Sequence, residues 1–209
     1  MTAKIKLNAA SGGGSFSLQA PSSSANTRVM TLPDSADGTV LTTTNPKAGN
    51  IIQVVNFRKG DHASATINGS SSGSTNWDYT GFSPAITPSA TSNKIMMVGH
   101  LSMGGDTTAL HIEVMINGSK TDGTVNGDTN GSRRTVHTSS FIEYDRNVTP
   151  FPINFVFSPN STSTQTYNFR FSHDSTTNKV IYINRSANSD NNLRQGDSVS
   201  HITLMEIAA

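Results

Sequence analysis

The chain has 209 residues, a formal net charge of +1 and a hydrophobic content of only 33%. Its near-neutral charge argues against nucleic acid as the main partner, and the absence of cysteine excludes disulfides and thiolate metal sites. Disorder would require a large net charge as well as few apolar residues, so we expect a folded protein with a sparse core.

The first segment, residues 1–46, contains short apolar stretches separated by turn-forming residues, at 5–7, 16–18, 29–32 and 40–41. About 40 residues rarely build a self-sufficient core, and a two-stranded hairpin is marginal in water. We therefore predict an N-terminal arm for attachment or oligomerisation that gains structure by packing on another surface. Disorder of the isolated arm is the alternative.

The beginning of the chain lacks the apolar core of a signal peptide, and no run approaches the ~18 apolar residues of a membrane helix. We therefore expect synthesis in a cytoplasm and no membrane insertion.

Residues 47–209 predict a C-terminal domain, called the knob below, made of short strands with apolar residues at every second position and no helix of consequence. Strands are expected near 51–57, 82–87, 94–103, 108–117, 133–144, 151–158, 166–173, 179–184 and 200–207. Turn signals such as Asn117-Gly118 separate them. Eight or nine strands in about 160 residues predict an all-β fold of the jelly-roll β-sandwich type.

Two kinds of strand can be distinguished in the knob. Segments 108–117 and 166–173 have one apolar face and one wet or partly wet face, whereas 51–55, 95–98 and 202–207 are apolar on both faces. We expect these three to share a sheet whose second face is buried between identical copies of the chain. The residues predicted at that interface are Ile52, Val54, Met96, Val98, Met205 and Ile207. Burial of the face by the N-terminal arm is the alternative.

Nothing in the sequence requires an active site or a metal ion. The six histidines show no His-x-x-x-His or His-Glu-x-x-His spacing. His111 and Glu113 lie on one strand face, where we expect cross-strand polar pairing instead of a metal site. Residues 126–131 imitate the first half of a calcium loop, but His137 occupies the position of the bidentate Glu. We predict a polar hairpin loop there, no catalytic residues, no metal, no cofactor and no enzymatic activity.

The candidate receptor-binding residues are Trp77, Asp78 and Tyr79, in a loop that contains the only tryptophan. Exposed aromatic rings in loops offer flat surfaces to sugars and peptides. The alternative is that Trp77 begins a strand and packs in the core. The polar segment 185–194 is a second candidate, either as a contact loop or as a seam between subunits.

Short strings spread along nearly the whole chain carry a family resemblance. They are SFSLQAP at 15–21, TLP at 31–33, DGTVLTTTN at 37–45, IIQVV at 51–55, ITPSATSNKI at 86–95, VIYINRS at 180–186 and ITLMEI at 202–207. As a set, they resemble segments of structural proteins from tailed phages, especially marine and cyanobacterial ones.

The resemblance implies a virion protein with an N-terminal attachment arm and a knob similar to the trimeric jelly rolls of the tumour-necrosis-factor and complement globular-head kind. In that architecture the first, third and last strands lie in the inner sheet, which faces a threefold axis. The three doubly apolar segments would occupy those places, so the resemblance makes the predicted self-contact a trimer interface.

The favoured function is a short tail fibre, tail-tip or appendage protein that mediates host attachment, located in the virion and assembled in the host cytoplasm. Its implied partners are two further copies of itself, other virion proteins through the arm, and a host surface glycan or protein. A head decoration or fibre-to-tail adaptor without a receptor is the alternative, and a polysaccharide depolymerase is a third possibility.

Overall fold

The computed structural model describes residues 4–19, 22–27, 29, 46–70, 75–106, 108–188 and 196–209. The chain divides into two compact units, Met1–Val40 and Leu41–Ala209. All regular secondary structure in the described residues is β-strand, which confirms the predicted all-β class. Over the same residues, no helix of the length and hydrophobicity that a membrane span requires is found.

The first unit contains a β-hairpin, in which β1 (Lys4–Asn8) pairs with β2 (Ser15–Gln19). Ile5 lies opposite Leu18, and the side chains of Ile5, Leu7 and Leu18 are all exposed. A hairpin with uncovered apolar side chains is marginal in water, so its stabilisation by another surface stays a prediction. The predicted apolar residues at 30–32 and 40–41 lie outside the described part of the chain.

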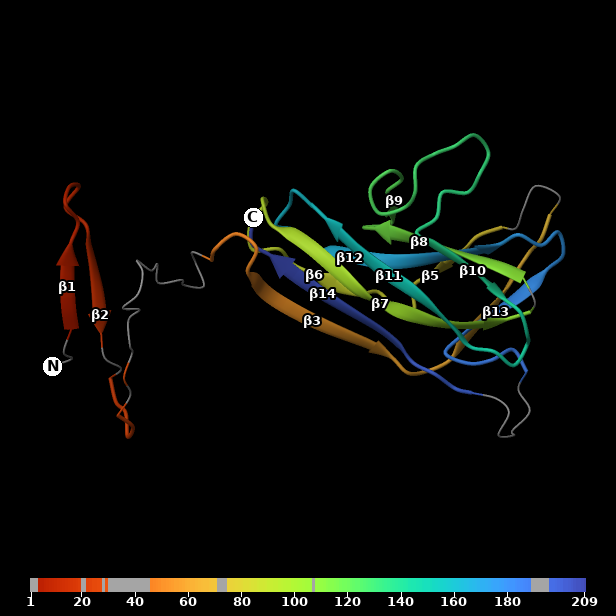
Figure 1. Cartoon of the computed structure of the whole chain (residues 1–209), viewed down its shortest axis with the longest axis horizontal. Helices are drawn as coiled ribbons and strands as arrows, with labels where there is room; N and C mark the ends of the chain where they lie inside the picture. The colour runs from red at the N-terminus through yellow and green to blue at the C-terminus, as the bar shows by residue number, and fades with distance from the viewer. Residues whose placement is uncertain are drawn as a thin grey trace, which may run out of the picture. The chain divides into compact units, whose positions relative to one another are not determined.

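The knob is a sandwich of two antiparallel sheets (Figure 1). In the first sheet the strand order is β3-β14-β7-β13-β4, and β11 pairs with the opposite edge of β7. Its strands are β3 (Ile51–Lys59), β4 (Ala63–Ile67), β7 (Lys94–Gly105), β11 (Thr149–Phe157), β13 (Lys179–Ile183) and β14 (Ser200–Ile207).

The second sheet has the order β10-β8-β12-β5. Its strands are β5 (Trp77–Tyr79), β8 (Thr108–Ile116), β10 (Thr138–Ile142) and β12 (Gln165–His173), with short β6 (Ala85–Ile86) beside β12 and β9 (Ser119–Lys120) beside β8. The chain crosses between the sheets from β7 to β8 and again at each step from β10 to β13. This alternation is the jelly-roll connectivity that the strand pattern predicts.

The core is formed by every second residue of the facing strands. Tyr167, Phe169 and Phe171 of β12 have no exposed side-chain surface, and neither do Met97 and Leu101 of β7. Because successive side chains on a strand point to opposite faces, the residues between them lie on the outer surfaces of the sandwich. The sites described below are built on those outer faces.

The three doubly apolar segments lie side by side, as predicted, because β14 pairs with β3 on one edge and with β7 on the other. Strand β4 was not predicted, because its sequence Ala-Ser-Ala-Thr-Ile offers small and polar side chains instead of a clear apolar alternation. The predicted turn at Asn117-Gly118 is confirmed: both residues have positive φ, 50° and 76°, which Asn and Gly tolerate best.

Candidate functional site

The predicted contact residues Trp77, Asp78 and Tyr79 form β5, the edge strand of the second sheet. The rings of Trp77 and Tyr79 lie 5.4 and 6.0 Å from the ring of Phe171, on the core side of the strand. Asp78, between them, is exposed on the outer face. The arrangement matches the alternative for Trp77, in which this residue begins a strand and packs in the core. Neither ring is displayed on a loop.

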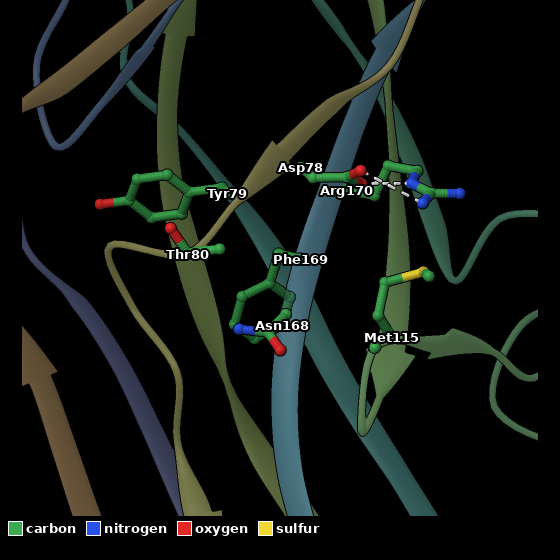
Figure 2. Close-up of a pocket in the computed structure, with 8 residues that line it drawn as sticks. Asp78, Tyr79, Thr80, Met115, Asn168, Phe169 and Arg170 are labelled. Atoms are coloured by element: carbon green, nitrogen blue, oxygen red, sulfur yellow. Dashed lines mark hydrogen bonds and ion pairs between the residues drawn. The ribbon is translucent and has the colours of Figure 1, made fainter.

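Asp78 borders a shallow pocket of about 170 Å³ on the outer face of this sheet (Figure 2). The pocket lies at a gap in the pairing along β12. Strand β5 pairs with β12 as far as Tyr79, which is opposite Phe169, and pairing resumes with β6 at Ala85. Its lining residues are Asp78, Tyr79, Thr80, Met115, Gly118, Asn168, Phe169 and Arg170. Ligand sites usually measure about 300 to 1,000 Å³, so this pocket could receive only a small group, such as one sugar unit or one side chain.

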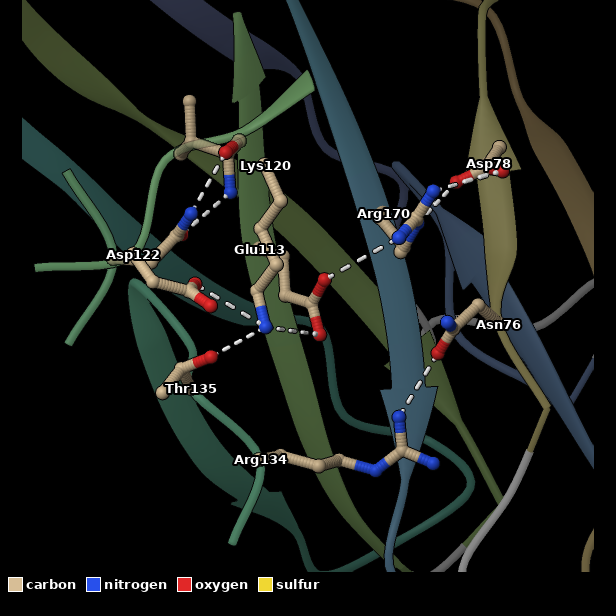
Figure 3. A network of polar contacts seen from close by, with 10 residues as sticks. Asn76, Asp78, Glu113, Lys120, Asp122, Arg134, Thr135 and Arg170 are labelled. Carbon is tan, nitrogen blue, oxygen red and sulfur yellow. Dashed lines mark hydrogen bonds and ion pairs between the residues drawn. The ribbon is translucent and has the colours of Figure 1, made fainter. Parts of the chain in front are cut away.

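Arg170 on β12 lies between Asp78 on β5 and Glu113 on β8, at directly opposed positions of the three strands (Figure 3). Its Nε and Nη2 atoms donate hydrogen bonds to the Asp78 carboxylate, and its Nη1 atom lies 3.8 Å from Glu113 Oε2. The hydrogen bond to Asp78 raises the pKa of Arg170 further, against the opposing effect of burial. The guanidinium is therefore a fixed positive charge beside the pocket.

The Glu113 carboxylate is buried between two cations. The Glu113 side chain is 5% exposed, and Oε1 lies 3.6 Å from Lys120 Nζ. Oε2 is buried without a hydrogen-bond partner among the described residues. Lys120 also lies 3.3 Å from Asp122 and donates to Thr135. Charge attraction without good hydrogen bonds makes Glu113 sensitive to the loss of either cation.

The loop that follows β9 covers this part of the second sheet. The backbone N–H of Val114 donates to Asn126 Oδ1, and Asn126 Nδ2 donates to the carbonyl of Val114, each at 2.9 Å. The amide thus fills the space along β8 between its partners β10 and β9. Asn126 is the first residue of the calcium-like segment, and this use of its side chain agrees with the expected polar loop.

The outer face of the other sheet carries an apolar row that crosses four strands. Val54, Met205, Met96 and Val156 lie opposite one another in sequence from β3 through β14 and β7 to β11. Val54 and Val156 are 52% and 53% exposed, and the two methionines are half-buried. Strands lie about 4.8 Å apart, so the row is roughly 14 Å wide. We call the outward side chains of these four strands the four-strand face.

Five of the six predicted interface residues lie on or beside this row, and a β-bulge changes the position of the sixth. Glu206 is opposite Gln53, but Ile207 is opposite Ile51, so Ile52 is the extra residue of β3. Ile52 borders a hollow together with Gln53 and Glu206, whereas Ile51 joins Ile207 and is 55% exposed. Ile51 therefore takes the place on the four-strand face that the sequence assigned to Ile52.

Further along the same strands the four-strand face becomes polar. Next to the apolar row, Val98 lies between Thr203 and Asn154, and Thr203 donates a 2.8 Å hydrogen bond to Asn56. The row after that consists of Arg58, His201, His100 and Pro152, in the order β3-β14-β7-β11. The face thus combines an apolar half with a histidine-containing half.

The remaining candidate groups have local structural partners. His111 and Glu113 each have a polar partner on a neighbouring strand, as expected: His111 Nδ1 lies 2.8 Å from Ser139 Oγ on β10, and Glu113 faces Arg170 on β12 as well as Lys120. In the described part of the chain, no group of three or more His, Asp or Glu side chains could hold a metal ion. In the second candidate segment, residues 189–195 lie outside the described residues.

No protein-family model matches the chain, and no curated protein is significantly similar to it. The solved structures that show some similarity to the chain include proteins of infectious bursal disease virus. A structure of the Gx strain is 11% identical with a TM-score of 0.40, over 87% of this chain and 47% of that one. The VP2 subviral particle is 12% identical with a TM-score of 0.35, over 92% and 47%. This chain spans about half the length of these proteins, and similarity at this level does not specify a function.

Proposed function

We propose that the chain is a virion structural protein whose knob forms a homotrimer through the four-strand face. The observation that carries the proposal is the apolar row Val54–Met205–Met96–Val156, which runs across β3, β14, β7 and β11. In the knob its valines are more than half exposed. An exposed apolar patch of this width is unfavourable in water and is typical of a contact surface. The resemblance of the sequence to tailed-phage proteins supplies the virion context and the threefold symmetry.

Within that context we propose a short tail fibre or tail-tip protein that attaches the particle to its host, docked to other virion proteins by the N-terminal arm. The pocket beside Asp78 and Arg170 supports a receptor contact, because it combines a fixed ion pair with the apolar side chain of Met115. A host glycan or a protein side chain is the expected occupant.

The alternative function is a head decoration or a fibre-to-tail adaptor that has no receptor. One observation favours it: the rings of Trp77 and Tyr79, which the sequence offered as a receptor platform, pack beside Phe171. The lack of catalytic activity also remains part of the proposal, and release of sugars from host envelope by the purified protein would contradict it.

Two measurements test the function. Sedimentation of the purified chain at micromolar concentration should show a stable trimer, and a stable single-chain species would overturn the self-association. Gold-labelled antibody against the knob, applied to intact particles, should mark the tail tip or fibres. Labelling spread over the head would favour the decoration role, and labelling at the junction of fibre and tail would favour the adaptor.

A further inference from the structure

The histidine row of the four-strand face contains two imidazoles that the sequence keeps far apart. His201 on β14 is directly opposite His100 on β7, and their ring centres are 6.1 Å apart. Two imidazole nitrogens about 2.1 Å from one metal ion place their ring centres about 4.5 to 6.5 Å apart, depending on the angle at the ion. The observed spacing exceeds the roughly 5.3 Å of a tetrahedral pair, so the exposed ring of His201 would have to tilt towards His100 to share an ion.

The hydrogen bonds of the pair leave the right nitrogens available. His100 Nε2 lies 3.2 Å from the backbone carbonyl of Val199. A carbonyl oxygen only accepts, so Nε2 carries the proton and Nδ1 keeps its lone pair. A metal-binding histidine usually donates its other N–H to such a carbonyl, which fixes the tautomer and the ring orientation. His201 is exposed.

The surroundings of the pair are open on the outer side. Pro152 flanks His100 on β11, and Arg58 is opposite His201 on β3. The Arg58 guanidinium lies beside Gly60 at the end of β3. The positive charge of Arg58 would repel a metal cation bound by His100 and His201, so these two histidines alone would bind a metal ion weakly. Zinc needs three or four protein ligands, and further imidazoles would have to come from outside this chain.

We infer that His100 and His201 form part of a transition-metal site that is completed by the same pair on neighbouring copies of the chain. Imidazole nitrogen suits divalent zinc, nickel, copper and cobalt. Three copies supply six imidazoles, which match octahedral coordination, and three of these would already satisfy the three protein ligands that zinc needs. The inference deepens the proposed function, because it rests on the four-strand face being the contact between copies. The ion would stabilise the polar half of that contact, as the apolar row stabilises the other half.

The test is a titration of Zn²⁺ or Ni²⁺ into the full chain after dialysis against EDTA, followed by calorimetry and by light scattering for mass. We expect one ion per three chains and a complex that already dissociates at a higher protein concentration when EDTA is present. His201→Ala should weaken binding at least 10-fold, and His100→Ala should do the same. The matched control is His62→Ala, which changes an exposed histidine in the turn between β3 and β4 and should bind the ion like the wild type.

The outcomes separate the inference from the function on which it rests. Equal affinity of the wild type and His201→Ala would overturn the inference, and so would a metal-free trimer that binds no ion. In the second case the self-association would stand. An ion bound by a single-chain species with both histidines would contradict the completion by neighbouring copies and, with it, the proposed trimer. Because His201 is exposed, its variant should fold, and unchanged thermal unfolding without metal would verify this.

Discussion

Met205 on β14 lies directly opposite Met96 on β7, and both side chains face outward at the centre of the four-strand face. Neither is needed to fill the core between the sheets. We therefore predict that Met205→Lys leaves the fold intact but places a charge in the contact between copies. The dissociation constant of the trimer should rise at least about 100-fold, equivalent to about 3 kcal/mol, and sedimentation equilibrium would measure it.

A matched control for this change is Thr162→Lys, which adds the same charge at an exposed loop position of the knob. It should sediment like the wild type. If Met205→Lys remained fully trimeric at the same concentrations, the four-strand face could not be the contact surface.

The sequence predicted the strands of the four-strand face well, because Ile, Val and Met residues on both sides of a strand are rare in a chain with few apolar residues. Its register was harder to predict. The β-bulge at Ile52 of β3, opposite Glu206 and Ile207 of β14, moves Ile52 off the face. A bulge depends on how two strands that are distant in the sequence pair with each other. The His100–His201 pair could not be predicted for the same reason, since only strand pairing brings the two residues together.

The candidate receptor-binding residues Trp77 to Tyr79 show a second feature that is difficult to predict from sequence. Trp77 and Tyr79 occur among polar residues, and a local pattern cannot distinguish a displayed aromatic residue from one on an edge strand. Their neighbour in space is Phe171, a residue of β12 that lies far along the chain. The pocket beside Asp78 also depends on the interruption between β5 and β6, which no local pattern of residues indicates.

The ionic contacts of Arg170 lead to a prediction about stability. Arg170→Met would leave Glu113, which is 3% exposed, with Lys120 as its one remaining cation partner among the described residues. Removing one partner of a buried ion pair is costly, and because Lys120 remains we expect a loss of about 2 kcal/mol of unfolding free energy. Urea denaturation would measure the change.

Replacing the Glu113 carboxylate with a neutral amide should recover much of the stability lost in Arg170→Met. We expect the double variant Arg170→Met, Glu113→Gln to be more stable than Arg170→Met alone. Asp78→Asn is the control on the other side of the guanidinium, because Asp78 is exposed and its exposed ion pair should contribute less than about 1 kcal/mol. If Arg170→Met and Asp78→Asn were equally mild, Glu113 would not depend on Arg170.

The Asn126 side-chain amide forms hydrogen bonds with both backbone groups of Val114 on β8. We therefore expect it to contribute more to the free energy of unfolding than a polar residue in an exposed loop usually does. Asn126→Ala would leave both the N–H and the carbonyl of Val114 without these partners. Unpaired buried backbone groups cost about 1 to 3 kcal/mol each, and we expect a total loss of about 2 to 3 kcal/mol in urea unfolding. Asn126→Asp should be nearly as harmful, because a carboxylate cannot donate to the carbonyl. Asn130→Ala, at an exposed position of the same loop, should change little.

His111 gives the knob a defined dependence on pH. Burial lowers the pKa of His111 below its ordinary value, and the nearby charge of Arg134 lowers it further. The folded state therefore favours the neutral imidazole, whereas the unfolded chain takes up a proton near its ordinary pKa of about 6.5. The contribution of His111 to stability is complete above that value and is lost as the pH falls towards the lower pKa of the folded state.

Urea midpoints measured from about pH 8 down to about pH 5.5 should therefore fall with pH in the wild type, and the fall should be smaller in His111→Asn. Asparagine cannot titrate, but its amide can still reach Ser139, the present partner of His111. Asp174 does not interfere in this range. Burial would raise the pKa of Asp174, but hydrogen bonds from Thr108 and Ala109 outweigh that effect and lower it below its ordinary acidic value. Parallel curves for the wild type and His111→Asn would show that the half-buried imidazole of His111 does not control the pH dependence.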